Sequence, residues 1–353
     1  MKIAIIGSGI SGLSSAVLLS QDHDISLFES NDRFGGHANT VTISENKKII
    51  PVDTGFIVYN ELNYPNLVGL FNWLNVPTIS SDMSFAVSAR NGELEYSGSF
   101  KGLFAQKTNF LNLSFFKILR DIFIFFTFGY KYAFNFKGNE SLKEYVKRCK
   151  FSDEFVYDHL LPMSSAIWSC SGKEILNFPA KSLLSFFKNH QLINFIVRPK
   201  WRTVKGGSIE YVKKIISYLE TKKNNKLLLN TKIKSISSKN KKIIINFNNN
   251  NRSSVTYWMN ILQKLPTKKE IFISLNPFLI PKKSLTYKKI YYEHPIFNND
   301  TDEAQKKMIT IQGKDNIYFT GAWTGYGFHE DGINSAVNVV QTLNVKIPWN
   351  NNS

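Results

Sequence analysis

Three glycines near the start of the chain have the type and spacing of a phosphate-binding turn. Gly7, Gly9 and Gly12 form a GxGxxG pattern that follows the apolar run 3–6 and opens a helical pattern. In such a turn the first glycine allows a tight bend, the second lets the backbone approach a pyrophosphate, and the third lets helix and strand pack closely. The N–H groups at the N-terminus of the helix then bind the phosphates. The expected dinucleotide contacts are Gly7, Gly9, Ile10, Ser11 and Gly12.

An acidic residue ends the second expected strand, residues 25–28. Glu29 lies seventeen residues beyond Gly12, where a carboxylate accepts hydrogen bonds from the ribose hydroxyls of a dinucleotide. A cation and a glycine pair follow it, and these suit a cofactor that continues past its pyrophosphate, which favours FAD over NAD. Further cofactor contacts are therefore expected from Arg33, Gly35, Gly36 and His37. A glycine-rich turn that binds no ligand is the alternative.

These residues require a parallel sheet with helices on its faces. The run 3–6 is continuously apolar, which predicts a strand buried on both faces. Together with a helix to about Ser20 and the strand 25–28, it forms a βαβ unit. The further expected elements are a helix over 208–219, strands over 227–229, 233–236, 243–247 and 317–320, and a helix over 332–343. The pattern predicts an α/β fold with a Rossmann-type FAD/NAD(P)-binding domain.

Charge and cysteine content limit the partners and the compartment. The 353 residues include 44 Lys or Arg and 27 Asp or Glu, a formal net charge of +17. This excess suits nucleic acid, an anionic membrane surface or an acidic small molecule, or else simply solvated basic faces. No helix-turn-helix, zinc-finger or RNA-binding signature accompanies it, so we expect no nucleic-acid partner. Two cysteines form no disulfide framework and no metal-ligand spacing is present, which fits a reducing cytoplasm.

The segment 109–136 is rich in phenylalanine and helical in period. Apolar pairs alternate with the charged residues Lys117, Arg120 and Asp121. One interpretation is a core helix that packs against the substrate domain. The other is an aromatic face with basic flanks that inserts shallowly into an anionic membrane or lines a tunnel for an acyl chain.

Several longer motifs carry a resemblance to a known family. They are the ExxxRxGG pattern from Glu29 to Gly36 and the stretches 35–40, 53–60, 201–208, 254–260, 292–295 and 321–332. In these motifs the chain resembles the flavin-containing amine oxidase superfamily. It is most similar to a bacterial branch of NAD/FAD-binding, amine-oxidase-like proteins that resemble the flavin domain of plant cyclopropane-fatty-acid synthases. The resemblance extends over nearly the whole chain.

The resemblance implies a fold of two interleaved domains. Residues 1–80, 203–250 and 305–345 would build a discontinuous FAD-binding domain, and residues 81–202 and 254–304 an α+β substrate domain. It also adds Gly55 to the expected cofactor contacts. No cysteine follows Cys170, so no cysteinyl link to a flavin can form in the C-terminal motif and we expect non-covalent FAD.

One departure from the family is a shortened segment. Family members continue for several dozen residues after the strand 243–247, whereas here residues 248–253 lead directly into the stretch 254–260. The missing part holds a buried strand of the FAD sheet. Each buried backbone group left without a partner costs of order 1–3 kcal/mol. The shortening therefore threatens both folding and flavin binding.

The C-terminal motif would place the flavin against the end of a helix. A strand ending at Gly321 would deliver backbone N–H groups to the ribityl chain. A helix that starts near Gly332 and is capped by Asp331 would direct its positive end towards negative charge on the reduced ring. Trp323 stands where many flavin proteins have an acid, so Glu330 or the backbone would make the ribityl contact instead.

His329 and Tyr326 are the candidate catalytic residues. A histidine titrates near neutrality and can transfer protons, although a structural histidine in the same loop is an equal interpretation. His190, in the expected substrate domain, is a further residue that would line the site.

The combined interpretation is an FAD-dependent oxidoreductase that transfers a hydride from a small or lipid-like substrate, such as a fatty-acyl chain, to flavin N5. One alternative is an amine oxidase that releases hydrogen peroxide, and another is a degenerate, non-catalytic scaffold at the membrane. The expected location is the cytoplasm, with or without peripheral contact with the inner face of an anionic membrane.

Overall fold

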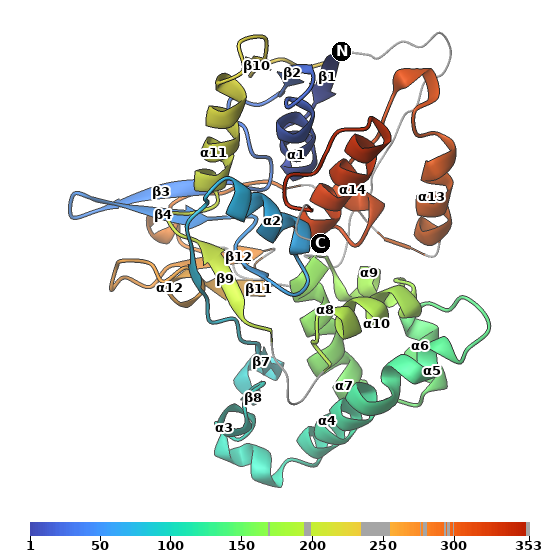
Figure 1. The fold of residues 1–353 in the computed structure, drawn as a ribbon. Helices are drawn as coiled ribbons and strands as arrows, with labels where there is room; N and C mark the ends of the chain where they lie inside the picture. The colour runs from blue at the N-terminus through green and yellow to red at the C-terminus, as the bar shows by residue number, and fades with distance from the viewer. Residues whose placement is uncertain are drawn as a thin grey trace.

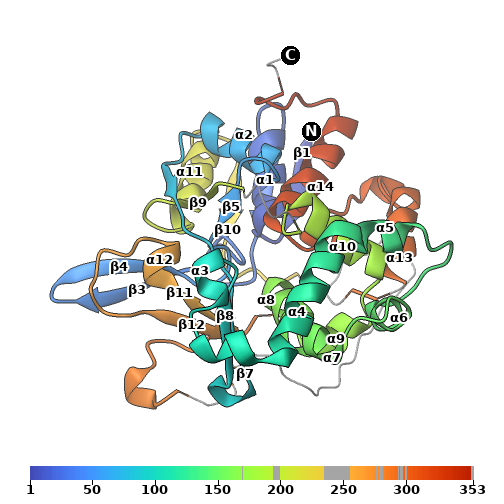
Figure 2. The same ribbon diagram turned by 90° about the horizontal axis from the view of Figure 1, so that it is seen from below.

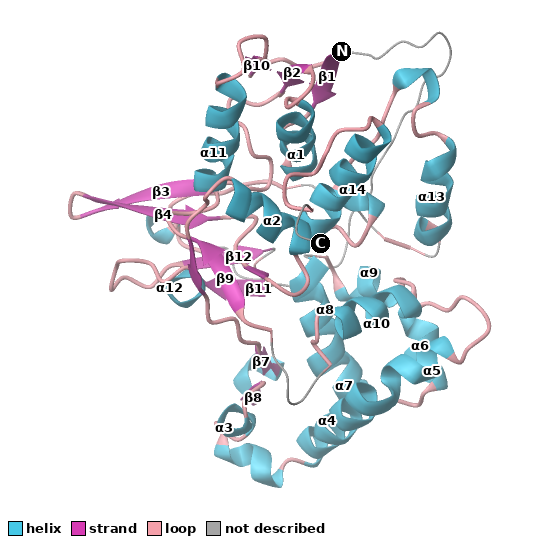
Figure 3. Cartoon of the chain, viewed as in Figure 1, coloured by secondary structure: helices cyan, strands magenta, loops and turns pink. Residues whose placement is uncertain are grey.

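The computed structural model describes residues 1–168, 170–193, 199–233, 255–275, 277, 281–292, 294, 297–298 and 300–350. A parallel sheet and its helices form one end of the molecule, and a helical region forms the other (Figure 1). The strands gather along one side, while the helical region contains almost none (Figure 3). The α/β fold expected from the sequence is confirmed.

The parallel sheet has the order β1-β2-β10. Its strands are β1 (Lys2–Ile6), β2 (Asp24–Phe28) and β10 (Lys226–Leu228), and its helices are α1 (Ile10–Leu19), α11 (Ile209–Glu220) and α14 (His329–Thr342). All ten residues of α1 are buried, because the helix packs against α11, α14 and the sheet. The βαβ unit and the helix expected over 208–219 are confirmed to within one or two residues.

Two expectations for this sheet are wrong. β1 is not buried on both faces, because Lys2, Ala4 and Ile6 on one face are exposed, Ile6 to 51%, while Ile3 and Ile5 on the other are half-buried. Residues 317–320 form no strand, because the side-chain amide of Gln312 bonds the backbone N–H and C=O of Phe319 at 2.8 and 2.7 Å. Tyr318 and Phe319 are exposed as a result. Of the other expected strands, 243–247 and all but Ile233 of 233–236 lie outside the described residues, as does the segment 248–253.

The remaining strands form small antiparallel sheets. They are β3 (Thr40–Glu45) with β4 (Lys48–Asp53), β5 (Tyr59–Asn60) and β6 (Thr78–Ser80) on either side of β9 (Trp201–Val204), β7 (Ala86–Ala89) with β8 (Leu94–Ser97), and β11 (Val255–Trp258) with β12 (Phe272–Leu275). The β3–β4 hairpin projects from the side of the molecule in both ribbon views (Figures 1 and 2).

The other helices differ in length and lie mostly in the helical region. They are α2 (Pro65–Trp73), α3 (Phe100–Leu103), α4 (Leu113–Ile124), α5 (Tyr130–Phe134), α6 (Leu142–Arg148), α7 (Asp153–Phe155), α8 (Leu161–Trp168), α9 (Gly172–Leu176), α10 (Ala180–Asn189), α12 (Met259–Leu262) and α13 (Thr301–Lys307). A π-helical turn, Phe125–Gly129, joins α4 to α5. No helix within the described ranges combines the length and the apolar character that crossing a bilayer requires.

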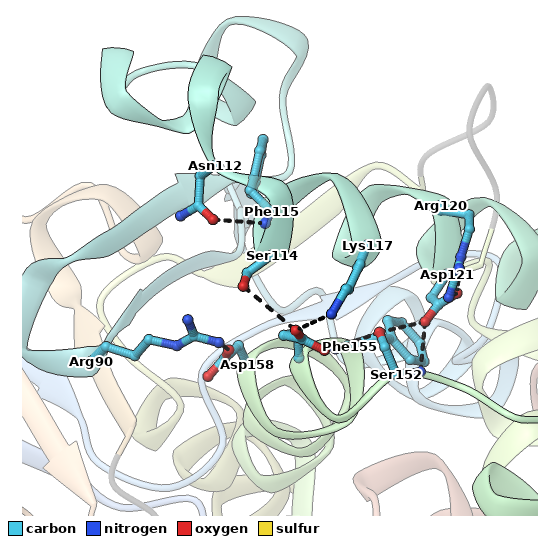
Figure 4. A network of polar contacts seen from close by, with 11 residues as sticks. Arg90, Asn112, Ser114, Phe115, Lys117, Arg120, Asp121, Ser152, Phe155 and Asp158 are labelled. Atoms are coloured by element: carbon cyan, nitrogen blue, oxygen red, sulfur yellow. Dashed lines mark hydrogen bonds and ion pairs between the residues drawn. The ribbon is translucent and has the colours of Figure 1, made fainter.

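Polar contacts hold α4 against α7. Asp121 is buried and accepts hydrogen bonds from the backbone N–H and the hydroxyl of Ser152 at 2.8 and 2.6 Å. Lys117 pairs with Glu154 of α7 at 2.8 Å, and Figure 4 shows this network along the helix. Phe115 and the following apolar residues on this side are buried in the core. The core interpretation of segment 109–136 is therefore confirmed for the inner face of α4.

Separate hydrophobic clusters support the two ends of the molecule. One joins α1, α2, α11 and α14, and another joins helices between Phe125 and Phe187 to Phe297. A third cluster joins the β3–β4 hairpin to residues 257–273, and so connects the first piece of the expected FAD-binding domain to the expected substrate domain. The exact division into interleaved domains stays a prediction.

Candidate functional site

The glycine turn between β1 and α1 is open on its outer side and closed on its inner side. Gly7 has φ +91°, a left-handed conformation that favours glycine. A Cβ atom placed at Gly7 or Gly9 would meet nothing within 4 Å, whereas one at Gly12 would lie 1.9 Å from the carbonyl oxygen of Gly7. Position 12 therefore requires glycine for packing, while position 9 leaves space for a ligand.

The N-terminus of α1 carries no neutralising side chain. Its N-cap residue, Gly9, makes no side-chain cap, and its first turn contains no acidic residue. The first N–H groups of a helix have no partners within the helix, and the helix dipole adds partial positive charge there. The pyrophosphate of a dinucleotide fits this end of α1, because it would meet open N–H groups and no Cβ atom. Ile10 and Ser11 are the first residues of the helix that it would reach.

Glu29 lies at the end of β2 and is already well hydrogen-bonded. One carboxylate oxygen accepts from the N–H of Ser8 at 2.9 Å and from its hydroxyl, and the other accepts from the N–H and side-chain amide of Asn31 at 2.9 and 2.7 Å. Burial acts to raise the pKa of Glu29, but these hydrogen bonds outweigh it and the pKa is lowered. The carboxylate is therefore ionised at neutral pH. A ribose hydroxyl would bind by replacing a side-chain donor such as that of Asn31.

The loop after Glu29 packs against the glycine turn. Gly35 and Gly36 have φ +118° and +57°, and a Cβ at Gly36 would lie 2.9 Å from the Cα of Gly9. Arg33 donates to the carbonyl oxygens of Gly36 and Ala38 at 2.8 and 3.4 Å. In the structure the guanidinium thus stabilises its own loop, and the two glycines let that loop approach the open turn.

His37 is covered by the aromatic ring of Tyr292. Its ring stacks on Tyr292 with 4.9 Å between centroids, and the Tyr292 hydroxyl bonds Asn39 and Thr54 at 2.8 and 2.7 Å. Burial, together with the charges of His294 and Arg33, lowers the pKa of His37 to about 4. Its Nε2 is buried and has no hydrogen-bond partner in the described part of the chain. A Cβ at Gly55 would lie 2.2 Å from the His37 carbonyl oxygen, so Gly55 acts by permitting this packing.

The N-terminus of α14 meets the N-terminus of α1. A Cβ at Gly332 would lie 2.7 Å from Ile10 and 2.9 Å from Ser11, and the two helices lie side by side (Figure 1). The expected start of the helix at Gly332 is wrong, since α14 begins at His329. Asp331 is therefore within the first turn, where it accepts a hydrogen bond from the N–H of the N-cap residue, Phe328, at 2.9 Å. Burial raises the pKa of Asp331 to about 6.

The carboxylate of Glu330 is already hydrogen-bonded within the chain. Its two oxygens accept from the N–H groups of Asn66 and Leu67 at 2.9 and 3.0 Å, and one also accepts from the Asn66 side chain at 3.0 Å. These N–H groups belong to the first turn of α2. Glu330 thus ties α14 to α2, and a ribityl contact by this side chain would compete with all three bonds.

His329 packs as a neutral aromatic ring. It stacks on Phe56 with 3.9 Å between ring centroids, and its Nε2 lies 3.1 Å from the hydroxyl of Tyr211. Burial is the main cause, and the nearby His37 a further one, that lowers the pKa of His329 to about 3. The expectation that this histidine titrates near neutrality is therefore wrong. Its catalytic role stays a prediction, while its packing fits the structural interpretation.

A pocket of about 510 Å³ opens beside the first turn of α14. It is lined by Leu62, Asn63, Asn189, His190, Gln191, Tyr326, Phe328, Glu330 and Asp331. Tyr326 and His190, which were expected to line a site, therefore come together here. The side-chain oxygens of Asn63 and Gln191 are buried and have no hydrogen-bond partner among the described residues. Unpaired buried acceptors are costly, so the pocket suits a ligand that donates hydrogen bonds.

Gly321 and Trp323 belong to the loop before α14 that also contains Tyr326, but they do not line the pocket. The indole of Trp323 packs over Gly321, where a Cβ would lie 2.1 Å from the indole nitrogen, and the side chain is 42% exposed. The N–H of Gly321 donates to the hydroxyl of Ser335 at 2.9 Å. The structure thus gives this N–H a partner within the chain instead of leaving it open for a ribityl group.

Four residues that shape the site have no obvious mark in the sequence. Ser8 and Asn31 donate hydrogen bonds to the carboxylate of Glu29. The sequence indicates this only by a serine inside the glycine turn and an asparagine two residues after the acid. Asn63 and Gln191 come from distant segments, and no local pattern predicts that they meet.

Comparison with known proteins gives matches of different extent. The model of the family described as flavin containing amine oxidoreductase matches residues 10–257. The 4,4'-diapophytoene desaturases (4,4'-diaponeurosporene-forming) of Staphylococcus aureus strains Newman and USA300 are each 48% identical over 40 residues, which is 11% of this chain and 8% of theirs.

Among solved structures, an oxidoreductase from Methanosarcina mazei matches with 18% identity and a TM-score of 0.43 over 65% of this chain and 51% of that one. A protein from Pyrococcus furiosus gives 16% identity and a TM-score of 0.38 over 65% and 51%. The chain thus spans about half the length of these structures and a small part of the desaturases.

Proposed function

Because this chain belongs to the flavin containing amine oxidoreductase family, we propose that it is an FAD-dependent oxidoreductase that holds its FAD non-covalently. The observation that supports this most directly is the open N-terminus of α1, where Gly9 leaves space and no acidic side chain competes with a pyrophosphate. The ionised Glu29 lies at the end of the neighbouring strand, as ribose binding requires.

The residues of the chain have distinct tasks in this proposal. The N–H groups at the start of α1 bind the pyrophosphate, Glu29 accepts from the ribose, and the loop with Gly35 and Gly36 encloses the cofactor. Bound FAD would supply a hydride acceptor, so that a substrate would lose the hydrogen of a C–H bond as hydride and a neighbouring N–H or O–H proton to solvent. The pocket beside Tyr326 would hold the substrate next to the junction of α1 and α14.

The pocket, whose surface is part polar and part apolar, favours a small substrate over a fatty-acyl chain. Apart from Leu62, Tyr326 and Phe328, its described lining is polar. The unpaired oxygens of Asn63 and Gln191 would accept N–H or O–H groups. A lipid-like substrate, the class implied by the resemblance, would need a longer apolar surface than this lining provides.

Amine oxidation is the second candidate function. The carboxylates of Glu330 and Asp331 at the pocket would attract a cationic amine, and His190 would stay neutral beside it because burial lowers its pKa to about 4. In this function the amine would lose two electrons and two protons to become an imine, and molecular oxygen would take up both and leave as hydrogen peroxide. A small alcohol or hydroxy compound would bind the same acceptors without the charge attraction.

The cofactor is tested by purifying the protein and recording its absorption spectrum. We expect a flavin spectrum, and acid precipitation should release a compound that chromatographs as FAD. Gly9→Val should yield folded, colourless protein, because its side chain would occupy the pyrophosphate space, whereas Glu29→Gln should only weaken binding, because one acceptor remains. A well-folded wild-type protein that stays colourless with added FAD would refute the proposal.

The substrate class is tested by mixing the flavoprotein anaerobically with small amines, small alcohols and fatty-acyl compounds. Loss of flavin absorbance with the amines, followed by peroxide formation when oxygen is admitted, would establish amine oxidation. Reduction by acyl compounds alone would contradict the small-substrate assignment and leave the FAD assignment intact.

A further inference from the structure

The outward side of α4 and of the turn that follows it combines aromatic and basic side chains. Phe116, Phe123 and Phe128 are 45%, 58% and 42% exposed, and Arg120 and Lys131 are exposed on the same helical segment. On a helix, residues spaced by three or four positions share a face, so cations and rings lie together along one surface. We call these five residues the α4 face.

The α4 face differs sharply from the inner side of the same helix. Phe115, Ile118 and Phe125 are fully buried, and Asp121 is 1% exposed. Asp121 points inward to Ser152, as Figure 4 shows, so the acidic group is withdrawn from the surface. The phenylalanines of this segment therefore divide into core rings and surface rings. Phe116 touches Phe115 and Phe128 stacks on Tyr132, yet both remain more than 40% exposed.

Positive charge predominates in this part of the chain. Residues 100–138 contain six Lys or Arg and a single acidic residue, the inward-pointing Asp121. Ion pairs reduce the charge of Lys117, through Glu154, and of Arg120, through Asp121. The remaining positive charge and the net charge of the chain, +17, complement an anionic surface.

We propose that the α4 face binds the surface of an anionic lipid bilayer. Phenyl rings enter the boundary between headgroups and acyl chains, while lysine and arginine stay at the level of the lipid phosphates. A second copy of this chain is a poor occupant, because two such faces would bring like charges together. Nucleic acid would meet phosphate partners only at the cations and would leave the exposed rings of Phe116 and Phe123 unused.

The location of the face allows this contact without covering the flavin site. α4 lies at the end of the molecule opposite α1 in Figure 1 and faces the viewer in Figure 2. Binding through this face is independent of the proposed oxidoreductase activity, and it needs no spanning helix.

The test is sedimentation of the full-length protein with vesicles of phosphatidylcholine, with and without phosphatidylglycerol. We expect at least tenfold tighter binding to the vesicles with phosphatidylglycerol, and at least a tenfold loss when salt rises from about 0.05 to 0.5 M, because screening weakens exposed charges. Absence of binding to the anionic vesicles at low salt would overturn the proposal.

Two variants separate the contribution of the rings from that of the charge. Phe116→Ser with Phe123→Ser should lose at least tenfold in vesicle binding, whereas Ile309→Ser with Ile311→Ser, which removes exposed apolar groups elsewhere, should bind like the parent. Lys131→Glu should weaken binding several-fold more than Lys314→Glu, a reversal at another exposed lysine.

Thermal melts show whether each variant is folded. If the phenylalanine pair unfolds, Lys131→Glu still decides, because its side chain is exposed. Binding that is equal for the parent, the folded phenylalanine pair and Lys131→Glu would refute the α4 face as the contact. A salt-sensitive complex with single-stranded RNA that is tighter than the vesicle complex would likewise overturn the assignment to lipid, as would a dimer in solution that needs Phe116 and Phe123.

Discussion

The N-termini of α1 and α14 touch at Gly332, but they differ in whether acidic side chains offset the positive end of the helix. At α1 the first turn contains no acidic residue and the N-cap is a glycine. At α14 the first turn contains Glu330 and Asp331, of which Asp331 bonds the N–H of its own N-cap residue and Glu330 bonds the first N–H groups of α2.

The difference shows which helix end is available to an external anion. A carboxylate in the first turn satisfies N–H groups and offsets the helix dipole, so α14 and α2 are neutralised within the chain. Only α1 of these three helices leaves its end open. The sequence motif identifies α1 by its glycines, but the structure adds that the neighbouring helix ends do not compete for the same phosphate.

The largest expected effect distinguishes the two sides of the glycine turn. Gly12→Ala should lower the free energy of unfolding by about 3 kcal/mol, because its Cβ would collide with the Gly7 backbone. Gly9→Ala, the matched control, should change it by less than about 0.5 kcal/mol while lowering the flavin content. Urea denaturation and the flavin-to-protein ratio measure both. Equal destabilisation by the two variants would show that the turn is not open at position 9.

A smaller effect is expected at the junction of α14 and α2. Glu330→Gln should destabilise the protein by about 2 kcal/mol, because an amide turned towards Asn66 and Leu67 leaves a buried N–H without an acceptor. Glu303→Gln serves as the control, since that carboxylate is 69% exposed and forms an exposed pair with Lys307. Thermal melts should show a lower melting temperature for Glu330→Gln. The flavin content, followed in parallel, should change less than the melting temperature. An unchanged melting temperature would mean that α2 needs no external acceptor.

The smallest effect concerns the pH dependence of stability. Burial raises the pKa of Asp331 to about 6, so its favourable contribution is complete below its ordinary value of 3.8 and is lost as pH rises through 6. Asp331→Asn should remove this loss of stability with rising pH and keep the acceptor for Phe328. Glu29 has a lowered pKa, so its contribution is present above 4.5 and lost as pH falls.

Urea titrations at pH 4 to 7 check the opposite signs. The free energy of unfolding of the parent minus that of Asp331→Asn should fall with rising pH. The free energy of unfolding of the parent minus that of Glu29→Gln should rise between pH 4 and 5. Parallel curves for Asp331→Asn and the parent would contradict the raised pKa.

Local patterns predicted the elements whose packing is itself local. The glycines fixed the turn into α1, and the spacing of apolar residues located β2 and α11. The burial of β1 and of residues 317–320 could not be predicted in this way, because it depends on which strand lies beside β1. The apolar run 317–320 has the composition of a strand, yet the side chain of Gln312 forms hydrogen bonds with the backbone N–H and C=O of Phe319.

The site was predictable where one segment supplies it and unpredictable where distant segments meet. Glu29 and Gly36 could be placed near the turn because the intervening chain is short. The partner of Glu330 is 264 residues away, and the ring against His329 comes from Phe56. From sequence alone, His329 is expected to have a pKa near neutrality. The burial that lowers this pKa depends on tertiary packing, which the sequence did not predict.

The bonds of Glu330 also determine how the pocket can move. Leu62 and Asn63 lead directly into α2, and the carboxylate fastens the start of α2 to the start of α14. This wall of the pocket therefore shifts as one rigid body. The facing wall, at the end of α10, is joined to it through Asn63, whose amide donates to the carbonyl oxygen of Asn189. Ring contacts of Phe328 with Phe186 and of Tyr64 with His190 join the same two walls, so widening the pocket for a substrate would require these contacts to loosen as well as the Asn63 bond.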